Sequence, residues 1–347
     1  MRALPLVTAT LLLGACATRP PGDYTVAVPP GVTDARARFT EIYCAVLREH
    51  GPDLPDYRPC EEALSRIAGQ PPGTGTPVDL GPARRPLVAA MVPGIGYACF
   101  APWLESPNTP RDHVRKFGYD ARAIEVDALS GTATNALQIR DAILAMPAEP
   151  GPPRLLLIGY SKGTPDILEA VVRYPEIHDR IAAIVSVAGA VGGSALANDA
   201  KRWQADLLRH WPKAECDSGD GEAVSSLRPE IRKAWLAANP LPANLRFYSL
   251  VTLPDRGRIS RIVAPTYEKL AKIDPRNDSQ VIYEDQIVPG SALLGFLNAD
   301  HWAVVVPVAR AHPVIGSTLA NRNDYPREAL LEAVLRFVEE DLANSNQ

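Results

Sequence analysis

One serine, at the centre of the pentapeptide GYSKG (residues 159–163), is placed where a hydroxyl group can act as a nucleophile. The pentapeptide follows the short apolar run LLLI (155–158) and precedes a segment whose apolar residues have helical spacing. A buried strand, a sharp turn and a helix around G-x-S-x-G form a nucleophile elbow, in which a strained serine presents its Oγ. We therefore predict that Ser161 is a nucleophile and not part of a plain glycine-rich turn.

A histidine and an aspartate follow that could activate this serine. His301 lies on the loop directly after the last predicted strand (292–297), and the other five histidines fall in predicted helices or peripheral loops. Asp278 precedes His301 by 23 residues, which leaves room for a loop and a strand, whereas Asp285 precedes it by only 16. His301 would take the serine proton, and an aspartate would hold the imidazole in the right tautomer. We favour Asp278 as this acid, with Asp285 as its rival.

The elbow in this context, with the order Ser, Asp, His, resembles the α/β-hydrolase family. In that family the loop after an early strand commonly reads His-Gly-x, and the amide of x is one oxyanion donor. Here PGIG (93–96) follows the predicted strand 87–92, with proline in place of the histidine. The resemblance implies two oxyanion donors, the backbone amides of Ile95 and Lys162. The amide of Gly96 is a near alternative to that of Ile95. We expect the Lys162 side chain itself to be solvated or salt-bridged near the mouth of the site.

The family's acid commonly lies in a pattern such as Asn-Asp-Gly-x-Val, which NDSQV (277–281) matches with serine in place of glycine. The resemblance implies hydrolysis of an ester through an acyl-serine intermediate. No cofactor or metal is implied.

Strands and helices alternate along the part of the chain that must position these residues. This rhythm predicts a mostly parallel sheet with helices on both faces, an α/β-hydrolase domain over residues 87–347. Residues 189–244 interrupt it with helices expected near 201–211 and 229–238, and the family often inserts a cap there. Residues 34–86 read as a small N-terminal helical hairpin. The predicted strands are 87–92, 121–126, 155–158, 181–187, 246–253 and 292–297, and the predicted helices 111–117, 132–146, 259–273 and 325–342.

The N-terminus has the pattern of a processing signal. Residues 3–15 are apolar but too short to span a bilayer as a stable helix, and LGAC (13–16) resembles the lipobox of bacterial lipoproteins. The resemblance implies removal of residues 1–15, a lipid on Cys16, and a domain outside the cytoplasm at the cell envelope. An ordinary secretory signal with an incidental cysteine is the alternative. Residues 16–33 would then be a tether.

Four cysteines remain besides Cys16, and an even number in an oxidising compartment favours disulfides. Cys44 and Cys60 lie 16 residues apart across a turn containing proline and glycine and would staple the N-terminal hairpin. Cys99 and Cys216 are then the remaining pair.

Composition narrows the function classes. The chain has 347 residues, 46% of them hydrophobic, and a net charge of −4, with no basic stripe that would favour nucleic acid. The leading interpretation is an envelope-anchored serine esterase or lipase that acts on a small-molecule or lipid ester. An acyltransferase of the same fold, or a non-catalytic envelope lipoprotein that uses the fold for binding, are the alternatives.

Overall fold

The computed structural model describes residues 24–104, 109–147, 151, 154–199 and 219–344. At its centre is a parallel seven-stranded sheet with the order β2-β9-β8-β7-β6-β4-β5. The middle strands β6, β7 and β8 are buried along their whole length, as continuous apolar runs predict. The strands are β2 (Thr33–Asp34), β4 (Val88–Val92), β5 (Asp120–Ala123), β6 (Leu155–Tyr160), β7 (Ile181–Val187), β8 (Phe247–Thr252) and β9 (Ala292–Leu297).

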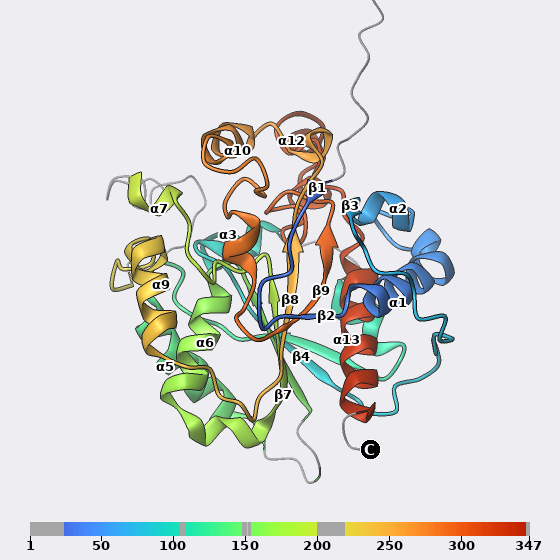
Figure 1. Cartoon of the computed structure of the whole chain (residues 1–347), viewed down its shortest axis with the longest axis horizontal. Coiled ribbons are helices and arrows are strands. Elements are labelled where there is room, and N and C mark those ends of the chain that lie inside the picture. The colour runs from blue at the N-terminus through green and yellow to red at the C-terminus, as the bar shows by residue number, and fades with distance from the viewer. Residues whose placement is uncertain (1–23, 105–108, 148–150, 152–153, 200–218, 345–347) are drawn as a thin grey trace, which may run out of the picture.

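Helices cover both faces of this sheet and enclose two separate apolar cores (Figure 1). One core lies under α5 (Thr132–Ala145) and α6 (Gly163–Arg173). The other lies under α1 (Arg36–Glu49), α4 (Pro110–Arg115) and α13 (Arg327–Asn344). The predicted α/β class, with a parallel sheet flanked by helices, is confirmed. In the described part of the chain, no helix is both long and apolar enough to cross a bilayer.

The segment between β7 and β8 differs in part from the expected cap. Its helix α9 (Pro229–Ala238) packs Trp235 and Leu236 against the core beside α5 and α6 (Figure 1). This helix therefore flanks the sheet instead of covering Ser161, because its apolar side chains pack on the core beside α5 and α6. Residues 201–211, where the other helix of the cap was expected, lie outside the described residues.

Part of the predicted tether belongs to the fold. β1 (Tyr24–Thr25) pairs in parallel with β3 (Ile67–Ala68), and β2 pairs in parallel with β9. The physical reason is that the edge of β9 offers unpaired backbone groups. The Thr33 amide donates to the Ser291 carbonyl, and the Ala35 amide to the Leu293 carbonyl, both over 3.0 Å. Cys16 lies outside the described residues, and its lipidation stays a prediction.

The N-terminal helices pack on the main domain. α1 buries an apolar face, and the predicted disulfide between Cys44 and Cys60 joins it to the short helix α2 (Cys60–Ala63). Cys99 also takes part in a disulfide, but its predicted partner Cys216 lies outside the described residues.

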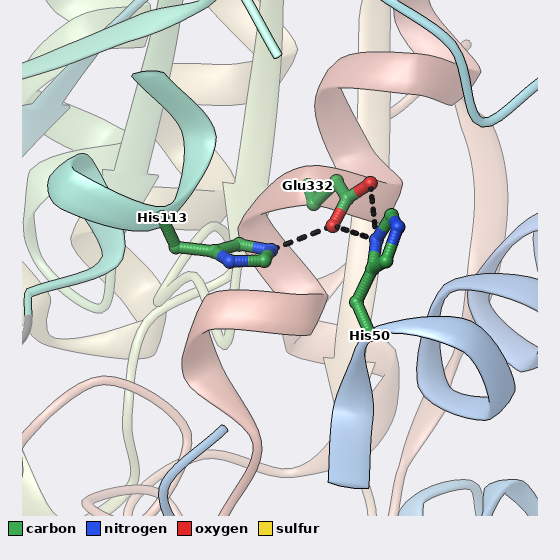
Figure 2. A group of neighbouring side chains, drawn as sticks. All are labelled: His50, His113 and Glu332. Atoms are coloured by element: carbon green, nitrogen blue, oxygen red, sulfur yellow. Dashed lines mark hydrogen bonds and ion pairs between the residues drawn. The ribbon is translucent and has the colours of Figure 1, made fainter. Parts of the chain in front are cut away.

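A buried polar cluster ties α1, α4 and α13 together (Figure 2). Glu332 of α13 is fully buried, and its Oε2 lies 2.6 Å from His113 Nε2 and 3.0 Å from His50 Nδ1. Arg336 Nε donates to the other oxygen over 2.7 Å. Burial alone would raise the pKa of Glu332, but the hydrogen bonds from His113, Arg336 and His50 outweigh it and lower that pKa. The carboxylate is therefore held ionised inside the protein.

The strand order places a topological switch point next to the predicted serine. β5 lies on one side of β4, and β6 lies on the other. The order in which the chain adds strands to the sheet therefore reverses between β4 and β6. Ligands of open α/β sheets bind outside the carboxyl ends of the strands at such a switch point. Ser161 follows β6, and residues 93–96 follow β4. The arrowheads of β8 and β9 point to the same end of the molecule, where α10 (Ala264–Ala271) and α12 (Pro313–Thr318) lie (Figure 1).

Candidate active site

Ser161 occupies a sharp turn between β6 and α6. Its φ angle is +54°, a left-handed conformation that is uncommon for a residue with a side chain. The turn requires close packing behind it, because a Cβ atom on Gly163 would lie 2.1 Å from the carbonyl oxygen of Val92 at the end of β4. The strained turn therefore fixes the direction of the serine Oγ, as expected of a nucleophile elbow.

Ser161, His301 and Asp278 form one hydrogen-bonded chain in the structure. His301 Nε2 lies 2.8 Å from Ser161 Oγ, and His301 Nδ1 lies 2.6 Å from Asp278 Oδ2. Asp278 is fully buried, and its Oδ1 accepts hydrogen bonds from the amides of Gln280 (2.9 Å) and Val281 (2.8 Å). These amides stabilise the ionised carboxylate. The arrangement allows the imidazole to take a proton from the serine while the aspartate stabilises the cation that results.

Two side chains that were not predicted from the sequence make hydrogen bonds to Asp278 and His301. Thr252, the last residue of β8, places its Oγ1 2.5 Å from Asp278 Oδ2. The Tyr160 hydroxyl donates over 2.7 Å to the backbone carbonyl of His301. Tyr160 could have been suspected because it lies inside the serine motif, whereas nothing in the local sequence marks Thr252.

The rival acid Asp285, and two other titratable residues near the end of the chain's last strand, Asp300 and His312, have other partners. The Asp285 carboxylate pairs with Lys233 Nζ of α9 over 3.1 Å. The Asp300 carboxylate accepts hydrogen bonds from the amides of Ser260 and Ala303, so it points away from the imidazole of the neighbouring residue. His312 stacks on an indole ring and bonds to a backbone carbonyl, both of Trp103.

The loop after β4 passes close to the serine and supplies a free amide. A Cβ atom on Gly94 would lie 2.9 Å from Ser161 Cβ, so only glycine allows this approach. The Gly96 amide donates to the Ala128 carbonyl over 3.0 Å, which removes it as an oxyanion donor. Within the described residues, the amides of Ile95 and Lys162 donate to no protein acceptor. These two amides remain available for an oxygen bound beside Ser161.

The side chain of Lys162 is buried, although we expected it near the mouth of the site. Only 1% of the residue is exposed, and its Nζ lies 2.7 and 2.9 Å from the two carboxylate oxygens of Asp166. Asn135 Nδ2 donates to the same carboxylate over 2.8 Å. Burial raises the pKa of Asp166, against the opposing effect of the Lys162 ammonium. The ammonium group thus pairs with Asp166 inside the protein and not with solvent.

A set of possible metal ligands lies on the flank of the sheet, in the cluster of Figure 2. One ligand atom each of His50, His113 and Glu332 lies within 4.8 Å of the others. The carboxylate already accepts hydrogen bonds from both rings and from Arg336. His113 Nδ1 is buried and has no hydrogen-bond partner among the described residues, whereas metal-bound histidines usually donate their second N–H to an acceptor. We interpret the cluster as a hydrogen-bonded joint between three helices.

Comparison with known proteins identifies solved structures that are similar to this chain. No protein-family model and no curated protein matches the chain. Among solved structures, the metagenomic carboxyl esterase MGS0156 is 38% identical, with a TM-score of 0.83 over 92% of this chain and 97% of the esterase. The mature lipase BlEst2 of Bacillus licheniformis is 19% identical (TM-score 0.53; 70% of this chain, 95% of the lipase) and shares the fold. The same holds for the Staphylococcus hyicus lipase, at 12% identity (TM-score 0.53; 78% and 99%).

A solved carboxyl esterase at 38% identity over nearly the whole chain, together with the elbow and its hydrogen-bonded histidine, establishes the family. The chain belongs to the α/β-hydrolase family of carboxylesterases and lipases and is a serine hydrolase.

Proposed function

We propose that this chain hydrolyses carboxylic esters through an acyl intermediate on Ser161, at the bacterial cell envelope. The observation that carries the chemistry is the unbroken path from buried Asp278 through His301 to the serine, with contacts of 2.6 and 2.8 Å. The similarity to a carboxyl esterase supports an ester as the substrate.

In the first half of the reaction, Ser161 Oγ attacks the ester carbonyl while its proton passes to His301 Nε2. Asp278 keeps the Nδ1–H tautomer and stabilises the imidazolium. The carbonyl oxygen becomes negative and accepts hydrogen bonds from the amides of Ile95 and Lys162, each worth about 3 kcal/mol of barrier. The imidazolium then protonates the departing alcohol, which leaves an acyl-serine ester.

In the second half, a water molecule gives its proton to His301 Nε2 and attacks the acyl carbonyl. The same amides stabilise the second oxyanion, and its collapse returns the proton to Ser161 Oγ. Hydrolysis of a small-molecule or lipid ester then needs no cofactor beyond the side chains described here. A lipid on Cys16, in the lipobox-like LGAC, would keep the enzyme at a membrane.

The test is hydrolysis of p-nitrophenyl esters over a range of acyl chain lengths, together with labelling by a fluorophosphonate. The wild type should be labelled and turn over, Ser161→Ala should lose both, and the control Ser226→Ala, which changes a serine outside the site, should keep both. Absence of labelling in folded wild-type protein would refute the acyl-serine proposal, and labelling without ester turnover would refute hydrolysis.

The envelope location is tested separately by growing cells with a clickable palmitate analogue. Label should appear on the wild type and disappear from Cys16→Ser. Equal labelling of the two proteins, or of neither, would contradict the lipid anchor while leaving the esterase proposal intact.

A further inference from the structure

Large apolar side chains are exposed at the end of the molecule that holds the active site. Eight are exposed among the described residues, and four of them lie on two short segments, 262–273 and 314–319. Val314 and Ile273 are the two most exposed, at 77% and 66%. Contiguous exposed apolar groups mark interaction sites, whereas single ones are ordinary. We call Ile262, Ile273, Val314 and Leu319 the apical apolar surface.

The two segments are joined to each other and to the active site. The Ile262 amide donates to the Leu319 carbonyl over 2.9 Å, which connects the chain before α10 with the end of α12. α10 and α12 lie together at one end of the molecule (Figure 1). The Ser260 amide donates to Asp300, the neighbour of His301, and the loop after Ile273 leads to Asp278. A partner on this surface would therefore lie at the edge that carries the reactive groups.

The N-terminus of the described chain lies at the same end. Arg276, three residues after Ile273, donates from Nη1 to the Thr25 carbonyl over 3.1 Å, which joins β1 to the loop that follows Ile273. Eight peptide steps separate Cys16 from Tyr24. Fully extended, they span at most about 28 Å. A lipid on Cys16 would thus hold this end of the domain, and not the opposite one, close to a bilayer.

The charge of this region also fits a bilayer that contains anionic lipid. Residues 253–276 carry six Lys and Arg against three Asp and Glu, although the whole chain has a net charge of −4. Four of these six cations pair with carboxylates, two of which, Asp199 and Asp324, come from outside the segment. Lys272 and, next to the second segment, Arg322 are exposed. Apolar side chains flanked by basic ones are typical of surfaces that bind in the membrane interface.

We propose that the apical apolar surface docks on an anionic lipid bilayer and presents the active site to esters held in that bilayer. The proposal rests on the proposed ester hydrolysis and on the anchor at Cys16. Docking would raise the rate on membrane-borne esters by holding the active-site end of the domain at the lipid surface, and it would leave the chemistry on dissolved esters unchanged.

The experiment uses the full chain and one substitution set, Ile262→Ser, Ile273→Ser, Val314→Ser and Leu319→Ser. The control set Leu137→Ser, Leu144→Ser and Ile231→Ser removes exposed apolar side chains of similar size on α5 and α9. All proteins keep the same N-terminus, so the contribution of the anchor is common to them. Each is assayed on dissolved p-nitrophenyl butyrate and on a long-chain fluorogenic ester in phosphatidylcholine vesicles with 25% phosphatidylglycerol.

The apical set should lose at least tenfold in rate on the vesicle ester and stay within twofold of wild type on p-nitrophenyl butyrate, while the control set should match wild type on both. Omission of phosphatidylglycerol should lower the wild-type rate on vesicles. An apical set as fast as wild type on vesicles would overturn the docking proposal. So would a shift from dimer to monomer in sedimentation without loss on vesicles, which would assign the surface to a second copy. Wild type inactive on p-nitrophenyl butyrate would instead refute the esterase proposal itself.

Discussion

The buried ion pair behind the serine gives a quantitative test of the structure. Lys162→Met removes the ammonium but leaves the Asp166 carboxylate fully buried, with Asn135 as its remaining side-chain donor. Removal of one partner of a buried pair typically lowers the free energy of unfolding by about 3–5 kcal/mol. Since a domain is stable by only about 5–15 kcal/mol, we expect Lys162→Met to unfold at much lower urea concentration.

The double variant Lys162→Met/Asp166→Leu removes both charges and should recover most of this loss. Asn135 Nδ2 would still have the Asp127 carbonyl, 3.2 Å away, as an acceptor. Apolar replacement of a complete buried pair is often neutral, so we expect the double variant within about 2 kcal/mol of wild type.

The loss in the single variant should depend on pH. Burial raises the pKa of Asp166 above its ordinary value, and Lys162 opposes that shift, so removing the lysine raises the pKa further. A carboxyl group whose pKa is higher in the folded than in the unfolded state favours folding at low pH and loses that contribution as the pH rises through the folded-state pKa. The loss in Lys162→Met should therefore be larger at pH 8 than at pH 5.

Urea denaturation of the wild type and both variants at the two pH values measures these differences, and turnover of p-nitrophenyl butyrate measures the effect on catalysis. The backbone amide of residue 162 remains in both variants, so kcat of the folded double variant should stay within tenfold of wild type. Equal stability of the single and double variants would refute the expected loss of stability from leaving the buried Asp166 carboxylate without its cation. A loss of kcat by a thousandfold in the folded double variant would refute the purely structural role of the lysine side chain.

Three further experiments test the site and the disulfide between Cys44 and Cys60. Asp278→Asn should lower kcat by about 10³–10⁴-fold with little change in Tm, because an amide stabilises the wrong imidazole tautomer; a drop below tenfold would contradict its role. Gly94→Ala would place a methyl 2.9 Å from the serine Cβ and 3.3 Å from its Oγ, so kcat/KM should fall at least tenfold, while Gly257→Ala, with no atom within 4 Å of its Cβ, should match wild type. Replacing Cys44 and Cys60 with serine opens a loop of 16 residues and should lower the free energy of unfolding by about 3 kcal/mol in urea denaturation. A decrease of less than about 1 kcal/mol would contradict the stabilising role of the disulfide.

Elements buried on both faces were predictable because their sequence has to be apolar throughout. The predicted strands 181–187 and 292–297 have the bounds of β7 and β9 in the structure. Elements fixed by distant partners were not predictable. β2 has two residues and no apolar pattern, and it exists because β9 offers it an edge. α9 looked like a helix of the cap because the local sequence shows an amphipathic helix without showing which surface it covers.

Polar residues inside the core were the other class that escaped prediction. Lys162 and Asp166 have the spacing of an ordinary surface pair on a helix, and only the packing of α6 against its neighbours shows that they are buried. Glu332 lies in a helix predicted to be amphipathic, but α1 and α4 bring His50 and His113 onto its polar side. Burial of a charge depends on segments far away in the sequence, so no local pattern reveals it.

The residues of the active site also fall into those that could be predicted from the sequence and those that could not. Groups that react or move a proton must be of a few residue types, and for this reason Ser161, His301 and Asp278 could be named from the sequence before their distances were known. Groups that act by position are chemically ordinary: Thr252 needs only a hydroxyl, and the oxyanion role that we propose for Ile95 needs only a backbone amide, which any residue could supply. Choosing between the amides of Ile95 and Gly96 required the hydrogen bond that Gly96 makes to Ala128. In a serine hydrolase, then, the sequence alone can identify the reacting side chains, whereas the supporting shell has to be read from the folded chain.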